Sequence, residues 1–146
     1  DILMWLLGPV ASVSAEVRVV TGRYGDCDET GTAMMRMKDG VVATLVAGWV
    51  DVANPVSLQI AGTEGHAIVV QDQLFFESKK VPGSKLGTPV AGLPPGPKVP
   101  LQQWVDAVGG ATGQPLVTPR EAAARVWVME AAYESARTGR WTTVAG

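Results

Sequence analysis

The chain has 146 residues, of which 47% are hydrophobic and 18% charged, enough for one globular domain with a sizeable core. Twelve Lys and Arg against fourteen Asp and Glu give a formal charge of -2. These charges are spread along the chain, so it has no basic footprint for nucleic acid or an anionic membrane. Cys27 is the single cysteine; it excludes an internal disulfide and fits a reducing, cytoplasmic compartment.

The opening segment, DILMWLLGPV, is apolar from its second residue. It has no basic region of the kind that begins a signal peptide, and it is far shorter than the ~20 apolar residues that span a bilayer. Gly8 followed by Pro9 is typical of a helix end. We therefore predict a helix from residue 1 to about residue 7, and we expect that this helix begins upstream of Asp1.

The next part of the chain predicts strands joined by tight turns. Valines interleave with polar residues over 13–21, a loop follows at 22–28, and two β-like runs then flank the Asp39-Gly40 turn. Because short turns connect the runs, we expect antiparallel pairing in a meander. The predicted strands cover residues 13–21, 30–37, 41–49, 56–61, 66–70 and 73–77.

The C-terminal part predicts a loop and two helices. Residues 82–100 are rich in proline and glycine, which predicts no regular element. A flexible surface loop is favoured over a segment laid across a functional surface. A short helix follows at 101–108, and a longer one begins at Thr118, with Pro119 and Glu121 completing a capping box, and ends at Gly139. A strand at 141–144 completes an α+β fold in which helices cover one face of a large, mostly antiparallel sheet of about six strands plus this last one.

Motifs for cofactor or metal chemistry are missing from the sequence. It contains no GxGxxG after a strand, no P-loop, no GxSxG and no HExxH. His66 is the only histidine and falls in a predicted strand, which favours a structural role. With Cys27 it leaves a zinc ligand set incomplete, so we predict no metal site.

Four blocks of the sequence, taken in order, carry a family resemblance. They are DILMWLLGPVASVSA, DETGTAMMRMKDGVVATLVAGW, LQIAGTEGHAIV and PLVTPREAAARVWVMEAAYESARTGRW. Together they resemble the C-terminal domain of the glucose-fructose oxidoreductase, inositol dehydrogenase and MocA (Gfo/Idh/MocA) family. The resemblance implies that residues 1–146 form a single substrate-binding and oligomerisation domain of an NAD(P)-dependent oxidoreductase acting on a sugar, cyclitol or related hydroxyl or carbonyl compound.

The resemblance also implies what this chain lacks. An N-terminal Rossmann domain, joined in cis, would hold NAD or NADP, so no cofactor is expected in the chain itself and we expect it to be inactive alone. Asp1 resembles the final aspartate of an Asp-x-x-x-His-x-x-Asp pattern, whose histidine acts as acid or base in the family. That histidine would lie three residues before Asp1, and a second family group, the lysine of a Glu-Lys-Pro motif, would lie in the other domain.

Candidate substrate-binding residues lie in two connections. The first contains Asp51 and Asn54, and the second contains Tyr24. A carboxylate and an amide bind sugar hydroxyls, but the same residues favour ordinary turns, and the two interpretations stay open.

The resemblance implies self-association as a homodimer or higher homo-oligomer through the open face of the sheet. We expect that face to include Met35, Met37, Leu45 and Val46, because an apolar sheet face is buried economically in a two-fold interface. The alternative to an oxidoreductase part is a stand-alone, non-catalytic binding or assembly module with the same fold.

Overall fold

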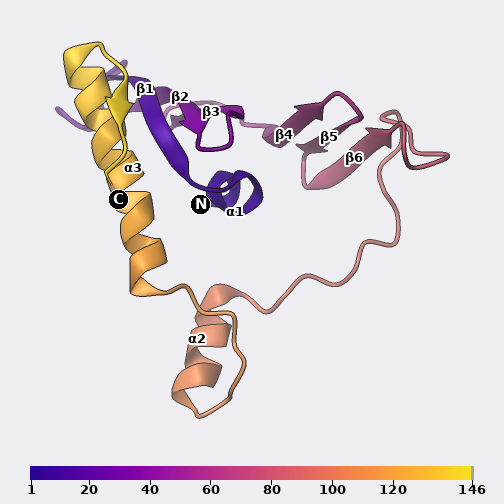
Figure 1. Ribbon diagram of the computed structural model, residues 1–146. Helices are drawn as coiled ribbons and strands as arrows, with labels where there is room; N and C mark the ends of the chain where they lie inside the picture. The colour runs from indigo at the N-terminus through magenta and orange to yellow at the C-terminus, as the bar shows by residue number, and fades with distance from the viewer. Residues whose placement is uncertain (146) are drawn as a thin grey trace. The chain divides into compact units, whose positions relative to one another are not determined.

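The computed structural model describes residues 1–145, and the chain forms two compact units, each with its own sheet (Figure 1). Unit 1 contains Asp1–Val50 together with residues 100–145, and unit 2 contains Asp51–Val99. No helix within residues 1–145 is both long and apolar enough to cross a membrane.

Unit 1 is built on a four-stranded antiparallel sheet with the strand order β3-β2-β1-β7. Figure 1 shows α3 along this sheet, beside β1. The elements of this unit are α1 (Ile2–Leu7), β1 (Val10–Arg18), β2 (Thr30–Met37), β3 (Val42–Gly48), α2 (Pro100–Val108), α3 (Pro119–Thr138) and β7 (Thr142–Thr143).

The core of unit 1 lies between this sheet and α3. Val13 of β1 and Met35 of β2 are directly opposite in register and are 0% and 4% exposed. Successive side chains of a strand point to opposite faces, so every second residue of β2 enters the core. The buried hydrophobic residues are Val10, Val13, Ala33, Met35, Met37, Ala43 and Ala131, with Leu3, Met4 and Leu7 of α1 packed against them.

The start of α3 has the predicted capping box. The Thr118 hydroxyl accepts from the Glu121 N–H at 3.2 Å, and the Glu121 carboxylate accepts from the Thr118 N–H at 2.8 Å. At the other end, Gly139 has a left-handed backbone with φ 66°, where a side chain would be strained. Both predicted helix boundaries are therefore confirmed.

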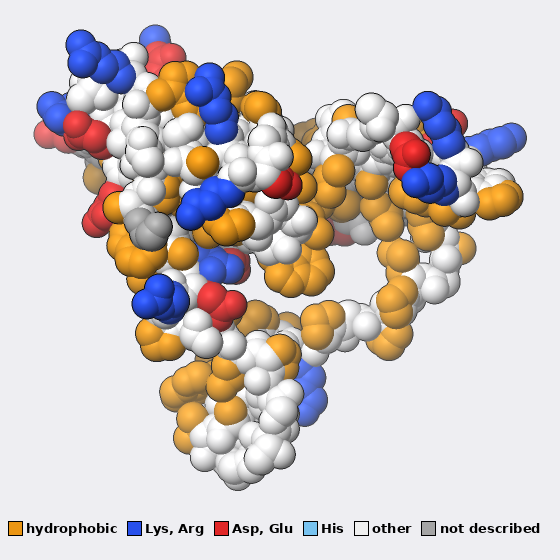
Figure 2. All heavy atoms as spheres, in the orientation of Figure 1, with side chains coloured by type: hydrophobic (Ala, Val, Ile, Leu, Met, Phe, Trp, Pro, Cys, Tyr) orange, Lys and Arg blue, Asp and Glu red, His pale blue; other side chains and the backbone are white. Residues whose placement is uncertain are grey.

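Helix α2 exposes most of its apolar side chains. Trp104, Val105 and Val108 are exposed together with Leu101. Figure 2 shows hydrophobic side chains on the surface of this helix. Within residues 1–145 the packing of the core therefore depends on α1 and α3.

One serine joins three parts of unit 1. The buried Ser135 hydroxyl of α3 accepts from the Ala15 N–H of β1 at 3.0 Å and donates to the Arg140 carbonyl at 2.7 Å. It thereby fixes α3 to the sheet and to the turn that leads into β7.

We expect Ser135→Ala to lower the free energy of unfolding by about 1–3 kcal/mol, because it leaves a buried N–H and a carbonyl without a partner. Urea denaturation followed by circular dichroism measures this change. Ser14→Ala is the matched control on the other face of β1, and it should stay within about 0.5 kcal/mol of the original chain. Equal losses in the two variants would contradict this role of Ser135.

Unit 2 is a three-stranded antiparallel sheet of β4 (Val56–Gly62), β5 (Gly65–Val70) and β6 (Gln73–Ser78), in that order. Gln71 and Asp72, at φ 48° and 62°, form the kind of two-residue turn whose twist matches a hairpin.

The proline-rich segment has no helix or strand over residues 79–99, apart from an isolated bridge between Pro89 and Phe75. The prediction for residues 82–100 is thus confirmed except at Pro100, which begins α2. The Val90 N–H donates to the Leu74 carbonyl at 2.8 Å. This part of the segment therefore lies along the edge of β6, and a role of the segment at a functional surface stays a prediction.

The α+β class and the order of elements are confirmed, with two differences. The first predicted strand covers Val10–Arg18 instead of 13–21, because the N–H groups of Val20 and Thr21 turn to the Glu29 side chain. The strands also form two sheets instead of one large sheet. The connection from β3 to β4 ends at Pro55, which has no N–H to donate to a ladder.

Candidate functional site

The start of α1 is held in place by α3. The Arg125 guanidinium donates from Nε to the Asp1 carboxylate at 2.7 Å and from Nη1 to the Glu121 carbonyl at 2.6 Å. The Arg125 side chain is 26% exposed, whereas that of Asp1 is 71% exposed. The contact orients the Asp1 carboxylate and leaves it accessible. Nothing in the sequence singles out Arg125, because it is one of many charged residues on a helix.

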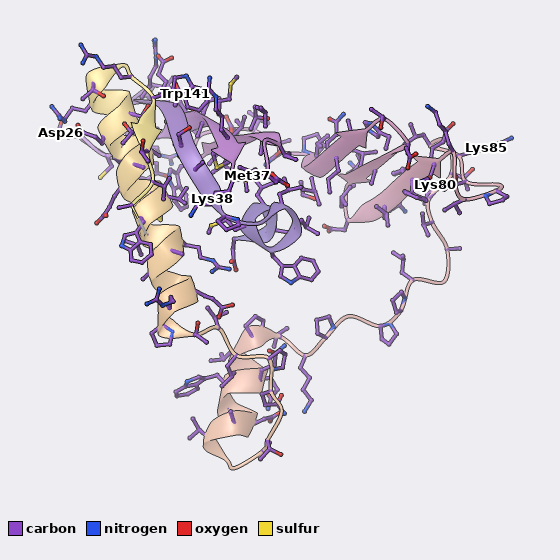
Figure 3. The ribbon with its side chains drawn as sticks, viewed as in Figure 1. Asp26, Met37, Lys38, Lys80, Lys85 and Trp141 are labelled. Carbon is purple, nitrogen blue, oxygen red and sulfur yellow. The ribbon has the colours of Figure 1, made fainter. Side chains whose placement is uncertain are left out.

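A small hollow of about 150 Å³ lies between α1 and α3. Met4 and Val10 line it from one side and Trp127 and Val128 from the other, and Lys38 adds a cation to its lining. Figure 3 labels Lys38, whose backbone N–H donates to the Pro9 backbone carbonyl at 2.9 Å. One carboxylate and two cations thus lie around α1, a set of groups suited to a polar or anionic substrate.

Tyr24 lies at the other end of β1 from Asp1. It is exposed in the loop after β1, and the Arg23 guanidinium lies 5.9 Å from its ring centroid. A nine-residue strand spans about 30 Å at ~3.3 Å per residue. The structure therefore does not bring Tyr24 to Asp1.

Asp51 and Asn54 belong to unit 2 and lie in the exposed connection before β4. They are three residues apart, and their substrate-binding role stays a prediction. His66 is half-buried on β5, and its Nε2 lies 3.4 Å from the Gln59 amide nitrogen on β4. A cross-strand contact of this kind fits a structural role.

The carboxylate of Glu29 organises the loop that carries Tyr24. Glu29 is 0% exposed and accepts hydrogen bonds from the Thr21 hydroxyl and from four backbone N–H groups, those of residues 20–23. These bonds, that of the Thr21 hydroxyl foremost, lower the pKa of Glu29 to about 2. Sequence reasoning missed this residue, because a single glutamate before a strand has no distinguishing pattern.

The predicted composition of the open sheet face needs a correction. Met35 and Met37 are buried in the core, and Leu45 pairs with Ala33 on the side that faces α3. The alternation of side chains along each strand places these residues together. Of the four predicted residues only Val46 is on the open face.

The open face has a different set of side chains. Val46 is accompanied there by Met34 and Val42, and all three are exposed. The Arg36 guanidinium lies 4.1 Å from the ring centroid of Trp141, which Figure 3 labels. This face therefore combines apolar side chains with a cation–π pair.

Comparison with known proteins places this fold. Residues 1–68 match the GFO/IDH/MocA C-terminal domain, whereas no curated protein sequence matches the chain. Among solved structures, an oxidoreductase from Agrobacterium radiobacter, in complex with NAD⁺, L-tartaric acid and magnesium, is 19% identical with a TM-score of 0.73; the match covers 99% of this chain and 46% of that one.

Two further solved structures are similar to the same extent. The WlbA dehydrogenase from Bordetella pertussis, in complex with NADH and UDP-GlcNAcA, is 19% identical with a TM-score of 0.73, covering 100% of this chain and 42% of that one. A levoglucosan dehydrogenase in complex with NADH and L-sorbose is 20% identical with a TM-score of 0.75, covering 99% of this chain and 47% of that one. This chain thus spans less than half the length of these proteins. The predicted resemblance is confirmed: residues 1–68 match the GFO/IDH/MocA C-terminal domain, and the fold of the chain is similar to that of part of these oxidoreductases.

Proposed function

We propose that this chain is the substrate-binding and oligomerisation part of an NAD(P)-dependent oxidoreductase that acts on a sugar, cyclitol or related hydroxyl or carbonyl compound. The observation that carries the proposal is the family match over residues 1–68. It is accompanied by a structural match to the levoglucosan dehydrogenase complex that covers 99% of this chain. The free, exposed thiol of Cys27 supports a cytoplasmic location.

Within this proposal the start of α1 is the substrate end of the domain. Asp1 accepts a hydrogen bond from a substrate hydroxyl, and Arg125 fixes the direction of its carboxylate. Lys38 contributes positive charge beside α1. The group that exchanges the proton with substrate is a histidine three residues before Asp1. Asp51 and Asn54, described only within unit 2, are proposed to bind substrate hydroxyls there, whereas Tyr24 lies at the other end of β1 from Asp1.

The residues described do not fit a nicotinamide nucleotide. A Rossmann site needs parallel strands with a crossover helix and a glycine-rich turn, whereas each strand pair in residues 1–145 is antiparallel. We therefore propose that a separate Rossmann domain of the same protein holds NAD or NADP, and we derive no chemical step through the nucleotide in this chain.

The proposal includes a homodimer formed through the open face of the four-stranded sheet. Met34, Val42 and Val46 expose apolar surface there, and a two-fold axis buries the same patch on both copies. Light scattering at micromolar concentration tests this part, and a monomer would contradict it.

The natural reading frame that encodes this chain gives the first test of the main proposal. We expect codons for a glycine-rich βαβ unit upstream of Asp1, and a histidine codon three positions before it. The complete protein should then bind NADH or NADPH and reduce NAD⁺ or NADP⁺ on addition of a polyol or sugar, followed at 340 nm. A frame that starts close to residue 1 would instead favour the stand-alone binding module.

In that complete protein we expect Asp1→Asn to lower kcat/KM about 10- to 100-fold, because the variant loses a charged contact that positions the reacting groups. Asp39→Asn is the matched control: Asp39 is an exposed turn residue whose carboxylate accepts from the Val41 N–H at 3.1 Å. Steady-state kinetics with one substrate measure both variants. Equal activity of the two variants would remove Asp1 from the proposed site.

A further inference from the structure

An apolar hollow of about 440 Å³ lies in unit 1, between the second half of α3 and the ends of β1, β2 and β3. We call it the α3 hollow. Its walls include Val17, Leu45, Trp49 and Met129. It is separate from the residues around Asp1, because none of those residues lines it.

The sequence explains why this space is not filled. Gly31 is opposite Val17 on one side and Ala47 on the other, and Ala33 is opposite Leu45. Small residues at neighbouring positions of three strands leave room under α3 that larger side chains would occupy. The hollow is therefore a consequence of side-chain size on the sheet face that also forms the core.

Two carboxylates line the hollow, those of Asp28 and Glu29, and that of Asp28 has the fewer hydrogen-bond donors. Asp28 is half-buried in the lining and accepts a hydrogen bond from the Tyr133 hydroxyl at 3.1 Å. That bond raises the pKa of Tyr133, so the tyrosine stays a neutral donor. Within residues 1–145 no Lys, Arg or His forms a salt bridge with Asp28. Its neighbour Glu29, in contrast, has five hydrogen-bond donors around its carboxylate.

Two aromatic residues share the lining of the hollow with this carboxylate. Trp49 is 80% exposed, and its backbone N–H donates to the Glu29 backbone carbonyl at 2.8 Å, which pairs the backbone of Trp49 with that of the residue after Asp28. Tyr133 contributes the second ring. Aromatic faces attract organic cations, and the carboxylate adds a full negative charge.

We propose that the α3 hollow binds an organic ammonium compound with an apolar body. The apolar walls take the hydrocarbon part, and Asp28, Trp49 and Tyr133 take the charged head. A polyhydroxylated sugar would find few polar partners in this lining, and an anion would be repelled by Asp28. The ligand class therefore differs from that of the proposed oxidoreductase site. The inference does not depend on the proposed oxidoreductase function.

Hexyltrimethylammonium is a suitable probe, with hexanol and hexanoate as neutral and anionic comparisons of similar length. Isothermal titration calorimetry should show binding of the ammonium at least about tenfold tighter than binding of hexanol, because only the cation gains the contacts with the carboxylate and the rings. Hexanoate should bind more weakly than hexanol. Equal affinities for all three compounds would overturn the proposal.

Matched variants locate the site. Asp28→Asn and Trp49→Leu should each weaken binding of the ammonium about fivefold or more, and Asp28→Asn should remove the preference for the cation over hexanol. Asp26→Asn, in the same loop (Figure 3) but not among the lining residues, and Trp5→Leu on α1 should leave the affinity unchanged. Thermal denaturation checks that each variant is folded.

Two results would overturn the inference. The first is the same loss of affinity in the Asp26 or Trp5 variant as in the Asp28 variant. The second is absence of binding together with a change from dimer to monomer in Trp49→Lys, measured by light scattering. That outcome would show that a second copy of the chain covers the α3 hollow.

Discussion

Met35→Ala is expected to lower the free energy of unfolding by about 2–5 kcal/mol, because truncating a buried methionine removes apolar contacts and leaves a cavity. Met35 is 4% exposed and packs against Val13 and Ala43 in the core of unit 1. The neighbouring methionine, Met34, is 46% exposed on the opposite face of β2.

Met34→Ala is therefore the matched control: the same truncation, one residue away, should change the free energy of unfolding by less than about 1 kcal/mol at a protein concentration at which the chain is monomeric. Urea denaturation of both variants at one pH gives the two values. Comparable losses would mean that β2 is shifted by one residue, because such a shift exchanges the two faces of a strand.

Glu29→Gln is expected to destabilise the chain strongly at neutral pH and progressively less in acid. The carboxylate has a pKa of about 2 in the folded chain, against an ordinary value of 4.5. A group with a lowered folded pKa stabilises the fold fully above its unfolded pKa and loses that contribution as the pH falls through the folded value. The difference in the free energy of unfolding between the original chain and Glu29→Gln should thus be constant above about pH 5. It should decrease between about pH 4.5 and pH 2.

Urea midpoints measured from pH 7 down to pH 2 test this dependence. Glu16→Gln is the control, since Glu16 pairs with Arg18 on the exposed surface, where an ion pair contributes little. The free energy of unfolding of Glu16→Gln should differ little from that of the original chain at each pH. If the difference in the free energy of unfolding between Glu29→Gln and the original chain does not decrease in acid, the role of the ionised carboxylate is contradicted.

Much of the fold follows from local signals in the sequence. Asp39-Gly40 predicted the β2–β3 turn, and Thr118 with Glu121 predicted the start of α3, because in both cases the determining contacts are within three residues. Val13 and Met35 are different. Their burial depends on which face of the strand meets α3, and α3 lies about a hundred residues further along the chain. Sequence reasoning therefore placed Met35 in a strand and on the wrong face.

The candidate site shows the same limit. Asp1 was identified through a family pattern, which encodes a position in a motif and needs no knowledge of the fold. Arg125, which holds the Asp1 carboxylate, and Glu29, which holds the loop at 20–23, act through contacts that are set by tertiary structure. The α3 hollow was not foreseen either, since it arises from small residues that become neighbours only when three strands pair.

The distance along the chain between Asp1 and Arg125, 124 residues, affects the order of folding during synthesis. Unit 2 is continuous in sequence, and its hairpins can close as soon as residues 51–99 have left the ribosome. Unit 1 is discontinuous: its first strands wait for α3 and β7, and the Asp1 carboxylate is oriented only after Arg125 has been made. A nascent chain stalled before α3 should therefore have a folded unit 2 and an exposed, incomplete sheet over residues 10–48, so that synthesis of α3 and β7 completes unit 1.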